Sequence, residues 1–216
     1  DTHHDSFPVV NVGLIALNVL ILLYSISVGG FEFLLGGGSD TIGAFFLKWG
    51  FIPLELTSGE TLTREIIPLD VETPIPTWGT IFSSMFMHGG LIHFAGNMAF
   101  LWVFGDNVED RIGHVKYLVF YLVVGVIATL SHWAVDQESA VPLVGASGAV
   151  AGVLGAYLLL YPYNRIKVLV IFFFITVAQL PAMVMLGIWF ALQLFNAFGS
   201  LGLSSQVNVA FFAHIG

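Results

Sequence analysis

Residues 145–161 read GASGAVAGVLGAYLLLY, a run of 17 residues without a single charge. Gly148, Gly152 and Ala156 recur at every fourth position, so on a helix they would line one face as a stripe of small side chains. Such stripes let membrane helices pack closely against one another. The run therefore predicts a short membrane span with close helix neighbours.

The composition of the whole chain points the same way. Of its 216 residues 57% are hydrophobic and 9% are charged, whereas a soluble domain carries roughly a quarter charged residues. The net charge of -8 and the lack of any basic cluster exclude nucleic acid as a partner. Because there is no cysteine, the sequence also excludes disulfides, thiol nucleophiles and thiolate metal sites.

Further apolar runs lie on both sides of this stretch, and their lengths predict an all-α membrane protein of six transmembrane helices in a single domain, 1–216. The expected spans are residues 8–28, 91–108, 117–135, 145–161 and 182–198, with a sixth that begins at residue 207. Ten residues are too few to cross a bilayer. We therefore expect the sixth helix to be truncated in this chain and the natural protein to continue beyond Gly216.

Two stretches differ from the spans. Residues 29–78 hold seven acidic residues and four prolines, which predicts a long first loop on the solvent side. Within it, residues 44–51 are rich in aromatics and are expected to lie in the headgroup layer. Residues 168–180 form an apolar run that Pro181 ends after 13 residues, so we expect an interfacial or re-entrant segment there.

The distribution of cations predicts the orientation. Arg111, Lys116, Arg165 and Lys167 lie in two short loops that face the same side of the membrane, whereas the long first loop holds only two bases. Short loops rich in Lys and Arg are cytoplasmic. We therefore expect a multi-pass protein of the plasma (inner) membrane, with its N-terminus in the cytoplasm and the acidic loop outside.

Four polar side chains are predicted to lie at one depth below the outer surface. His93 and Asn97 come early in the second span, Ser147 begins the fourth, and His214 comes early in the sixth. Ionisable residues inside a bilayer are costly and indicate function. A serine hydroxyl becomes a nucleophile when a histidine takes its proton. Ser147 and His214 are thus candidates for a catalytic dyad, with no carboxylate nearby to complete a triad.

The surroundings of Ser147 suit attack on a carbonyl group. Gly145 and Gly148 leave room for a substrate backbone, and the start of a helix presents N–H groups without intrahelical acceptors. An oxyanion formed there would be stabilised. His93 and Asn97 are four residues apart, so they share one face of their helix and could donate to the same oxyanion.

The chain resembles the rhomboid family of intramembrane serine proteases. The matching strings are HGGLIHFAGN at residues 88–97, Glu109-Asp110-Arg111, GASG at residues 145–148 and Ala213-His214. They occur in the order typical of the family and span most of the chain from about Trp78 onward.

The resemblance implies specific roles. Ser147 would be the nucleophile, His214 the general base, and His93, Asn97 and the Ser147 N–H the oxyanion hole. It implies an endopeptidase that needs no cofactor. Its substrates would be transmembrane segments of other proteins, cut near their outer end, with access around the fifth span and the loop before the sixth.

Other interpretations remain for some residues and for the chain. A rhomboid-like binder or chaperone of transmembrane segments without catalysis is the main alternative. A channel is disfavoured because the spans lack carboxylates and cations away from their ends. Two histidines and an asparagine are also a poor set of metal ligands. His88 is expected to support its loop through hydrogen bonds, and Glu109 to pair with Arg111 at the cytoplasmic rim.

Overall fold

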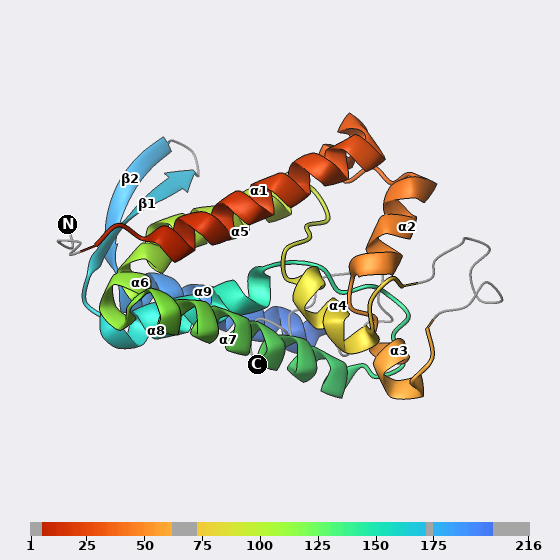
Figure 1. The fold of residues 1–216 in the computed structure, drawn as a ribbon. Coiled ribbons are helices and arrows are strands. Elements are labelled where there is room, and N and C mark those ends of the chain that lie inside the picture. The colour runs from red at the N-terminus through yellow and green to blue at the C-terminus, as the bar shows by residue number, and fades with distance from the viewer. Residues whose placement is uncertain (1–5, 62–72, 172–174, 201–216) are drawn as a thin grey trace.

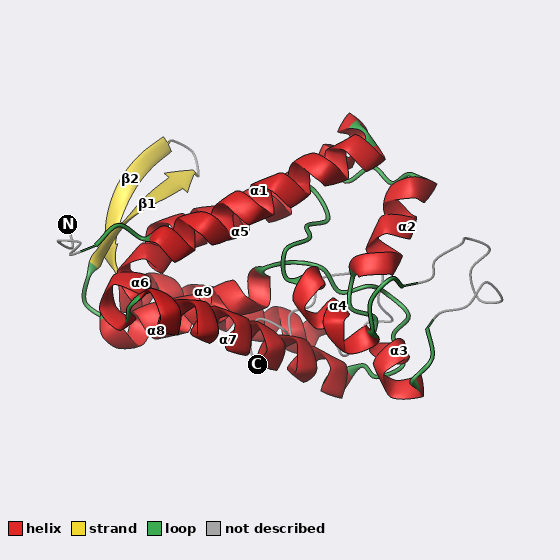
Figure 2. Cartoon of the chain, in the orientation of Figure 1, coloured by secondary structure: helices red, strands yellow, loops and turns green. Residues whose placement is uncertain are grey.

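The computed structural model describes residues 6–61, 73–171 and 175–200. The described part is mainly helical (Figure 2). Within it, two helices are long and apolar enough to cross a membrane, α1 (Val9–Gly29) and α7 (His114–Val135). Shorter apolar helices are α8 (Ser147–Leu160) and the first part of α9 (Ala182–Ser200). The expectation of a largely helical fold is confirmed, whereas the expected sixth span lies outside the described residues.

The stretch expected as the second span consists of three successive helical segments. These are α5 (Leu91–Phe100), the π-helical turn η2 (Leu101–Gly105) and α6 (Asp106–Ile112). A π-turn disturbs the regular hydrogen-bond ladder and is often found at functional or packing sites. Here the Leu101 carbonyl accepts a hydrogen bond from Nδ2 of Asn11, at 2.9 Å. The turn thus ties this helix to α1.

Glu109 of α6 is fully buried and holds the beginning of α1. Its carboxylate accepts hydrogen bonds from the backbone N–H of Val10 at 2.9 Å and of Asn11 at 2.6 Å. The first N–H groups of a helix have no intrahelical acceptor, and a negative charge is favourable beside them. The ring of His114 also contacts this carboxylate. The expected pairing of Glu109 with Arg111 is therefore wrong. The carboxylate of Glu109 instead bonds to the N-terminus of α1 and to His114.

Helix α8 occupies the centre of the bundle. It packs against α7, α5, α6, α9 and the π-turn η2. One side of the helix is fully enclosed, with buried side chains at Ala149, Val150, Val153, Leu154 and Tyr157. Gly152 allows the close contact with α7, because a methyl group there would lie 2.6 Å from a side-chain carbon of Val124. This agrees with the small-residue stripe in the sequence.

The first loop and the residues that follow it form short helices at one end of the bundle (Figure 1). They are η1 (Phe31–Leu35), α2 (Asp40–Trp49), α3 (Pro53–Ser58) and α4 (Thr77–Ser84). Phe51 and Leu143 exchange backbone hydrogen bonds, and the Gly145 N–H donates to the Ser84 carbonyl at 2.9 Å. The loop thereby fixes the segment that leads into α8.

The expectation of an all-α chain is wrong at residues 165–181. There β1 (Arg165–Ile171) and β2 (Ile175–Pro181) pair as an antiparallel hairpin. Both strands are rich in Val and Ile, which favour strands. Pro181 is tolerated because it is the last residue of β2, opposite Arg165. Hydropathy and length identified the run as apolar and too short to cross, but could not distinguish a hairpin from a helix.

Candidate active site

The site is built around Gly145, where the segment before α8 meets α5. A methyl group on Gly145 would lie 2.8 Å from Cε1 and 2.9 Å from Nε2 of His93, and 3.4 Å from Oγ of Ser147. The imidazole of His93 and the hydroxyl of Ser147 therefore both lie against this glycine. Its φ of 139° is in the region that favours glycine. Any other residue would displace the ring or distort the loop.

Ser147 is the first residue of α8, and its surroundings are rich in free backbone donors. The N–H of Val150 bonds to the Ala146 carbonyl at 2.9 Å, which is the first bond of the helical ladder. The N–H groups of Ser147, Gly148 and Ala149 therefore have no intrahelical acceptor. Ser147 itself is half-buried, with Ala146 fully buried behind it. A developing negative charge beside Ser147 would be stabilised by these donors and by the helix dipole.

Asn97 contributes an unused donor from α5. Its side chain is 6% exposed, and Nδ2 has no hydrogen-bond partner within the described residues. A buried donor without a partner is costly, so its presence calls for a ligand, a water or a transient anion. Asn97 lies one helical turn after His93 on the same helix. Asn97 thus shares a face of α5 with His93, whose ring lies against Gly145.

His88 is buried in the loop before α5. Its ring packs edge-on against His93 and Phe94, with centroid distances of 5.2 and 5.4 Å. Neither of its ring nitrogens has a hydrogen-bond partner within the described part of the chain. The expected support through hydrogen bonds is therefore replaced by ring packing. Burial, reinforced by the neighbouring His93, lowers the pKa of His88 to about 3, so the ring is neutral at physiological pH.

This pKa makes the fold sensitive to acid. An unfolded histidine titrates near 6.5 and folded His88 near 3, so between these values the unfolded state binds more protons and stability falls as pH decreases. From pH 7 to pH 5 the loss is about 2 kcal/mol. We expect His88→Phe to remove a loss of about this size, measured by unfolding in detergent at both pH values. An unchanged difference between the two pH values would contradict this role.

The general base expected at His214, with the adjacent Ala213, lies outside the described residues. The distance between Ser147 and His214 therefore stays a prediction. Within residues 6–61, 73–171 and 175–200, no three His, Asp or Glu side chains are grouped as metal ligands would be.

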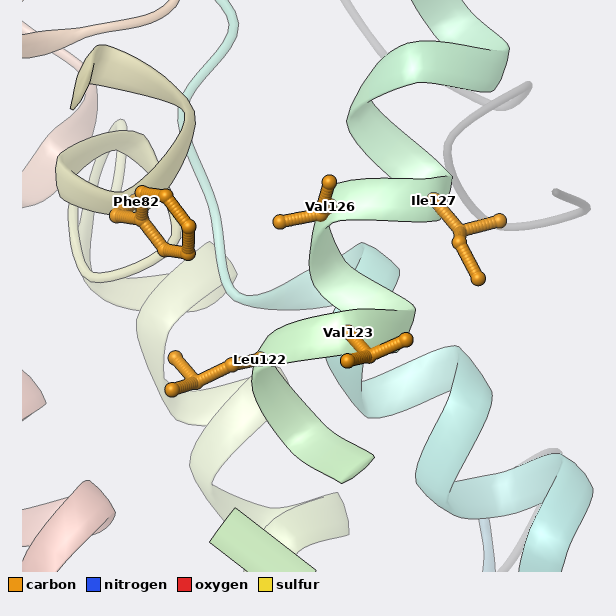
Figure 3. Close-up of a pocket in the computed structure, with 5 residues that line it drawn as sticks. All are labelled: Phe82, Leu122, Val123, Val126 and Ile127. Atoms are coloured by element: carbon orange, nitrogen blue, oxygen red, sulfur yellow. The ribbon is translucent and has the colours of Figure 1, made fainter. Parts of the chain in front are cut away.

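A hollow of about 200 Å³ lies elsewhere, between α4 and α7 (Figure 3). Its lining is entirely apolar and consists of Phe82, Leu122, Val123, Val126 and Ile127. None of these side chains can donate, accept or transfer a proton. The hollow is therefore no candidate for an active site.

Sequence reasoning missed a buried cluster of three residues that connects helices far apart in the sequence. The hydroxyl of Tyr117 donates to Oδ1 of Asn11 at 2.9 Å, and Gly105 lies against both groups. This cluster joins α1, α7 and the π-turn that continues from α5. The available signal was Asn11, an amide within an otherwise apolar span, because polar side chains in spans commonly bond across helices.

Comparison with known proteins identifies relatives by sequence. The model of the Rhomboid domain family matches residues 76–216. The chain is 29% identical over 119 residues to "Rhomboid protease GluP" of Bacillus subtilis, a match covering 53% of this chain and 23% of that protein. It is 40% identical over 77 residues to "Rhomboid-like protein 11, chloroplastic" of Arabidopsis thaliana, covering 36% of this chain and 27% of that protein.

A human relative, "Presenilin-associated rhomboid-like protein, mitochondrial", is 33% identical over 88 residues, covering 40% of this chain and 23% of that protein. The chain thus matches only about a quarter of the length of these curated relatives. No solved structure shows a significant match. The family match extends over well over half of the chain and includes the GASG string, His93 and Asn97. The chain therefore belongs to the rhomboid family of membrane proteins.

Proposed function

We propose that this chain is an intramembrane serine endopeptidase that cuts transmembrane segments of other proteins near the outer membrane face. Ser147 is the nucleophile and His214 the general base. One observation carries the proposal: the Ser147 hydroxyl and the His93 imidazole lie against the same glycine at the start of a buried helix. The B. subtilis relative, whose name calls it a protease, supports the choice of reaction.

In this mechanism the Ser147 Oγ attacks the carbonyl carbon of the peptide bond while His214 takes the hydroxyl proton. The carbonyl oxygen becomes an oxyanion, which accepts hydrogen bonds from the Ser147 N–H, His93 and Asn97. The carbon–nitrogen bond then breaks and His214 returns the proton to the leaving amine. Water, activated by the same histidine, hydrolyses the acyl ester and frees Ser147.

The proposal includes a topology. The chain has six spans, the last beginning at residue 207. It lies in the plasma (inner) membrane with its N-terminus on the cytoplasmic side. Arg111 in α6, Lys116 in the first turn of α7 and Arg165 at the start of β1 support this orientation. These segments lie at the end of the bundle where α1 begins (Figure 1). Gly145 and Ser147 then open toward the outer half of the bilayer.

Labelling with a fluorophosphonate probe tests the proposal. The probe reacts with activated serines, so we expect the protein to be labelled and Ser147→Ala to abolish the labelling. Ser25→Ala is the matched control, because the Ser25 hydroxyl is buried and bonds to the Ile21 carbonyl at 2.9 Å. A protein that binds a transmembrane peptide, but neither reacts with the probe nor cleaves the peptide, would instead be a non-catalytic binder.

A further inference from the structure

The hairpin of β1 and β2 projects from the end of the bundle where α1 begins (Figure 1). Its base is fixed to the helices. The Ala182 N–H donates to the Asn164 carbonyl at 2.7 Å, and the Met183 N–H to the Pro162 carbonyl at 3.0 Å. These bonds join the chain before β1 to the first turn of α9. The position of the hairpin and the position of the first turn of α9 are therefore coupled.

The base of the hairpin has two different faces. Along β1, Arg165 and Lys167 are exposed while Ile166 between them is buried. On β2 the residue opposite Lys167 is Gln179, which is exposed as well. Alternate residues of a strand point to opposite faces, so one face is cationic and polar. The other packs toward the bundle, where both strands contact α9.

The outer half of the hairpin has a different character. Its described residues read VLVI at 168–171 and ITV at 175–177 and include no charged residue, and Val177 is 61% exposed. Within the described residues the sheet has two strands, so each has one edge without a neighbouring strand. Unpaired backbone groups are not tolerated in hydrocarbon but can bond to water at its boundary. The outer half is thus too apolar for bulk water and too poorly paired for the bilayer centre.

We infer that the hairpin is a membrane-surface anchor, whose uncharged outer half lies at the headgroup boundary while Arg165 and Lys167 bind anionic lipid headgroups. The charges are complementary, because anionic lipids attract basic residues that flank a membrane span. Tyr163, 79% exposed beside the base, is of the type enriched at membrane interfaces. The anchor sets the depth at which α9 enters the bilayer.

The lack of cysteine allows this inference to be tested with single labels. Val177→Cys, carrying an environment-sensitive fluorophore, is placed in a Ser147→Ala background and reconstituted in phosphatidylcholine vesicles with or without phosphatidylglycerol. Glu138→Cys is the matched control, because Glu138 is exposed and belongs to the loop after α7, and that end of α7 lies at the opposite end of the bundle from the hairpin (Figure 1). We expect the Val177 label to emit at shorter wavelength, to be quenched by lipids carrying a shallow spin label, and to resist aqueous iodide. The Glu138 label should be quenched by iodide.

The charge contribution is tested by Arg165→Gln combined with Lys167→Gln. This pair should abolish any extra lipid quenching that phosphatidylglycerol produces, while leaving the quenching in pure phosphatidylcholine unchanged. A Val177 label as accessible to iodide as the Glu138 label would overturn the inference. So would disulfide cross-linking between unlabelled Val177→Cys chains that rises with protein density, because the strand edge would then pair with a second copy. Since catalysis is absent in this background, neither result depends on the protease proposal.

Discussion

Gly145→Ala is expected to reduce the rate of substrate cleavage by roughly 10²–10³-fold, the effect of losing one oxyanion-hole donor. The added methyl group would lie 2.8 Å from Cε1 of His93, closer than two carbon atoms can approach. Either the imidazole turns away or the loop before Ser147 shifts, and alanine is also disfavoured at a φ of 139°. The measurement is kcat on a transmembrane substrate in proteoliposomes, with thermal unfolding recorded alongside.

Two comparisons identify the cause of that loss. Gly89→Ala is the matched control, because Gly89 lies in the neighbouring loop and a methyl group there meets nothing within 4 Å. If Gly145→Ala acts by displacing His93, combining it with His93→Ala should cost little more than His93→Ala alone. Fully additive losses would show that the two residues act independently. A Gly145→Ala protein of normal rate would remove His93 from the proposed oxyanion hole.

The sequence was most informative where local pattern decides structure. The apolar run after Pro8 and the one ending at Val135 became the two long helices α1 and α7, because length and hydropathy are properties of a single segment. The stripe Gly148, Gly152, Ala156 likewise predicted the tight packing of α8. The sequence predicts that Gly145 leaves room for a substrate backbone, which stays a prediction; the structure adds that the His93 ring lies against this glycine.

What the sequence could not supply are contacts between distant segments. Glu109 accepts hydrogen bonds from N–H groups about a hundred residues earlier. The sequence around either position contains no pattern that predicts this contact. The π-turn η2 could not be predicted from the sequence either, because its residues are also common in an ordinary apolar α-helix. The strands of the hairpin were missed for another reason: an apolar run rich in Val, Ile and Phe suits a lipid-facing helix as well as a strand.

The same distant contacts make Gly105 a tightly packed position outside the site. A methyl group on Gly105 would overlap Oδ1 of Asn11 and lie 2.6 Å from the hydroxyl of Tyr117. The Tyr117 hydroxyl donates a hydrogen bond to this Oδ1, and Nδ2 of Asn11 donates to the Leu101 carbonyl of the π-turn. A larger residue must therefore separate α1 from α7 or break a buried hydrogen bond.

We expect Gly105→Ala to lower the free energy of unfolding by about 2–5 kcal/mol, combining overpacking with the loss of a buried hydrogen bond. Gly155→Ala is the control, because Gly155 is an exposed glycine in the interior of α8 with nothing within 4 Å of an added methyl. That change should be neutral or stabilising by up to about 1 kcal/mol. Unfolding in detergent measures both. Equal stability of the two variants would mean that α1 can move away from the π-turn at little cost. The cluster would then not fix the position of α5, the helix that carries His93.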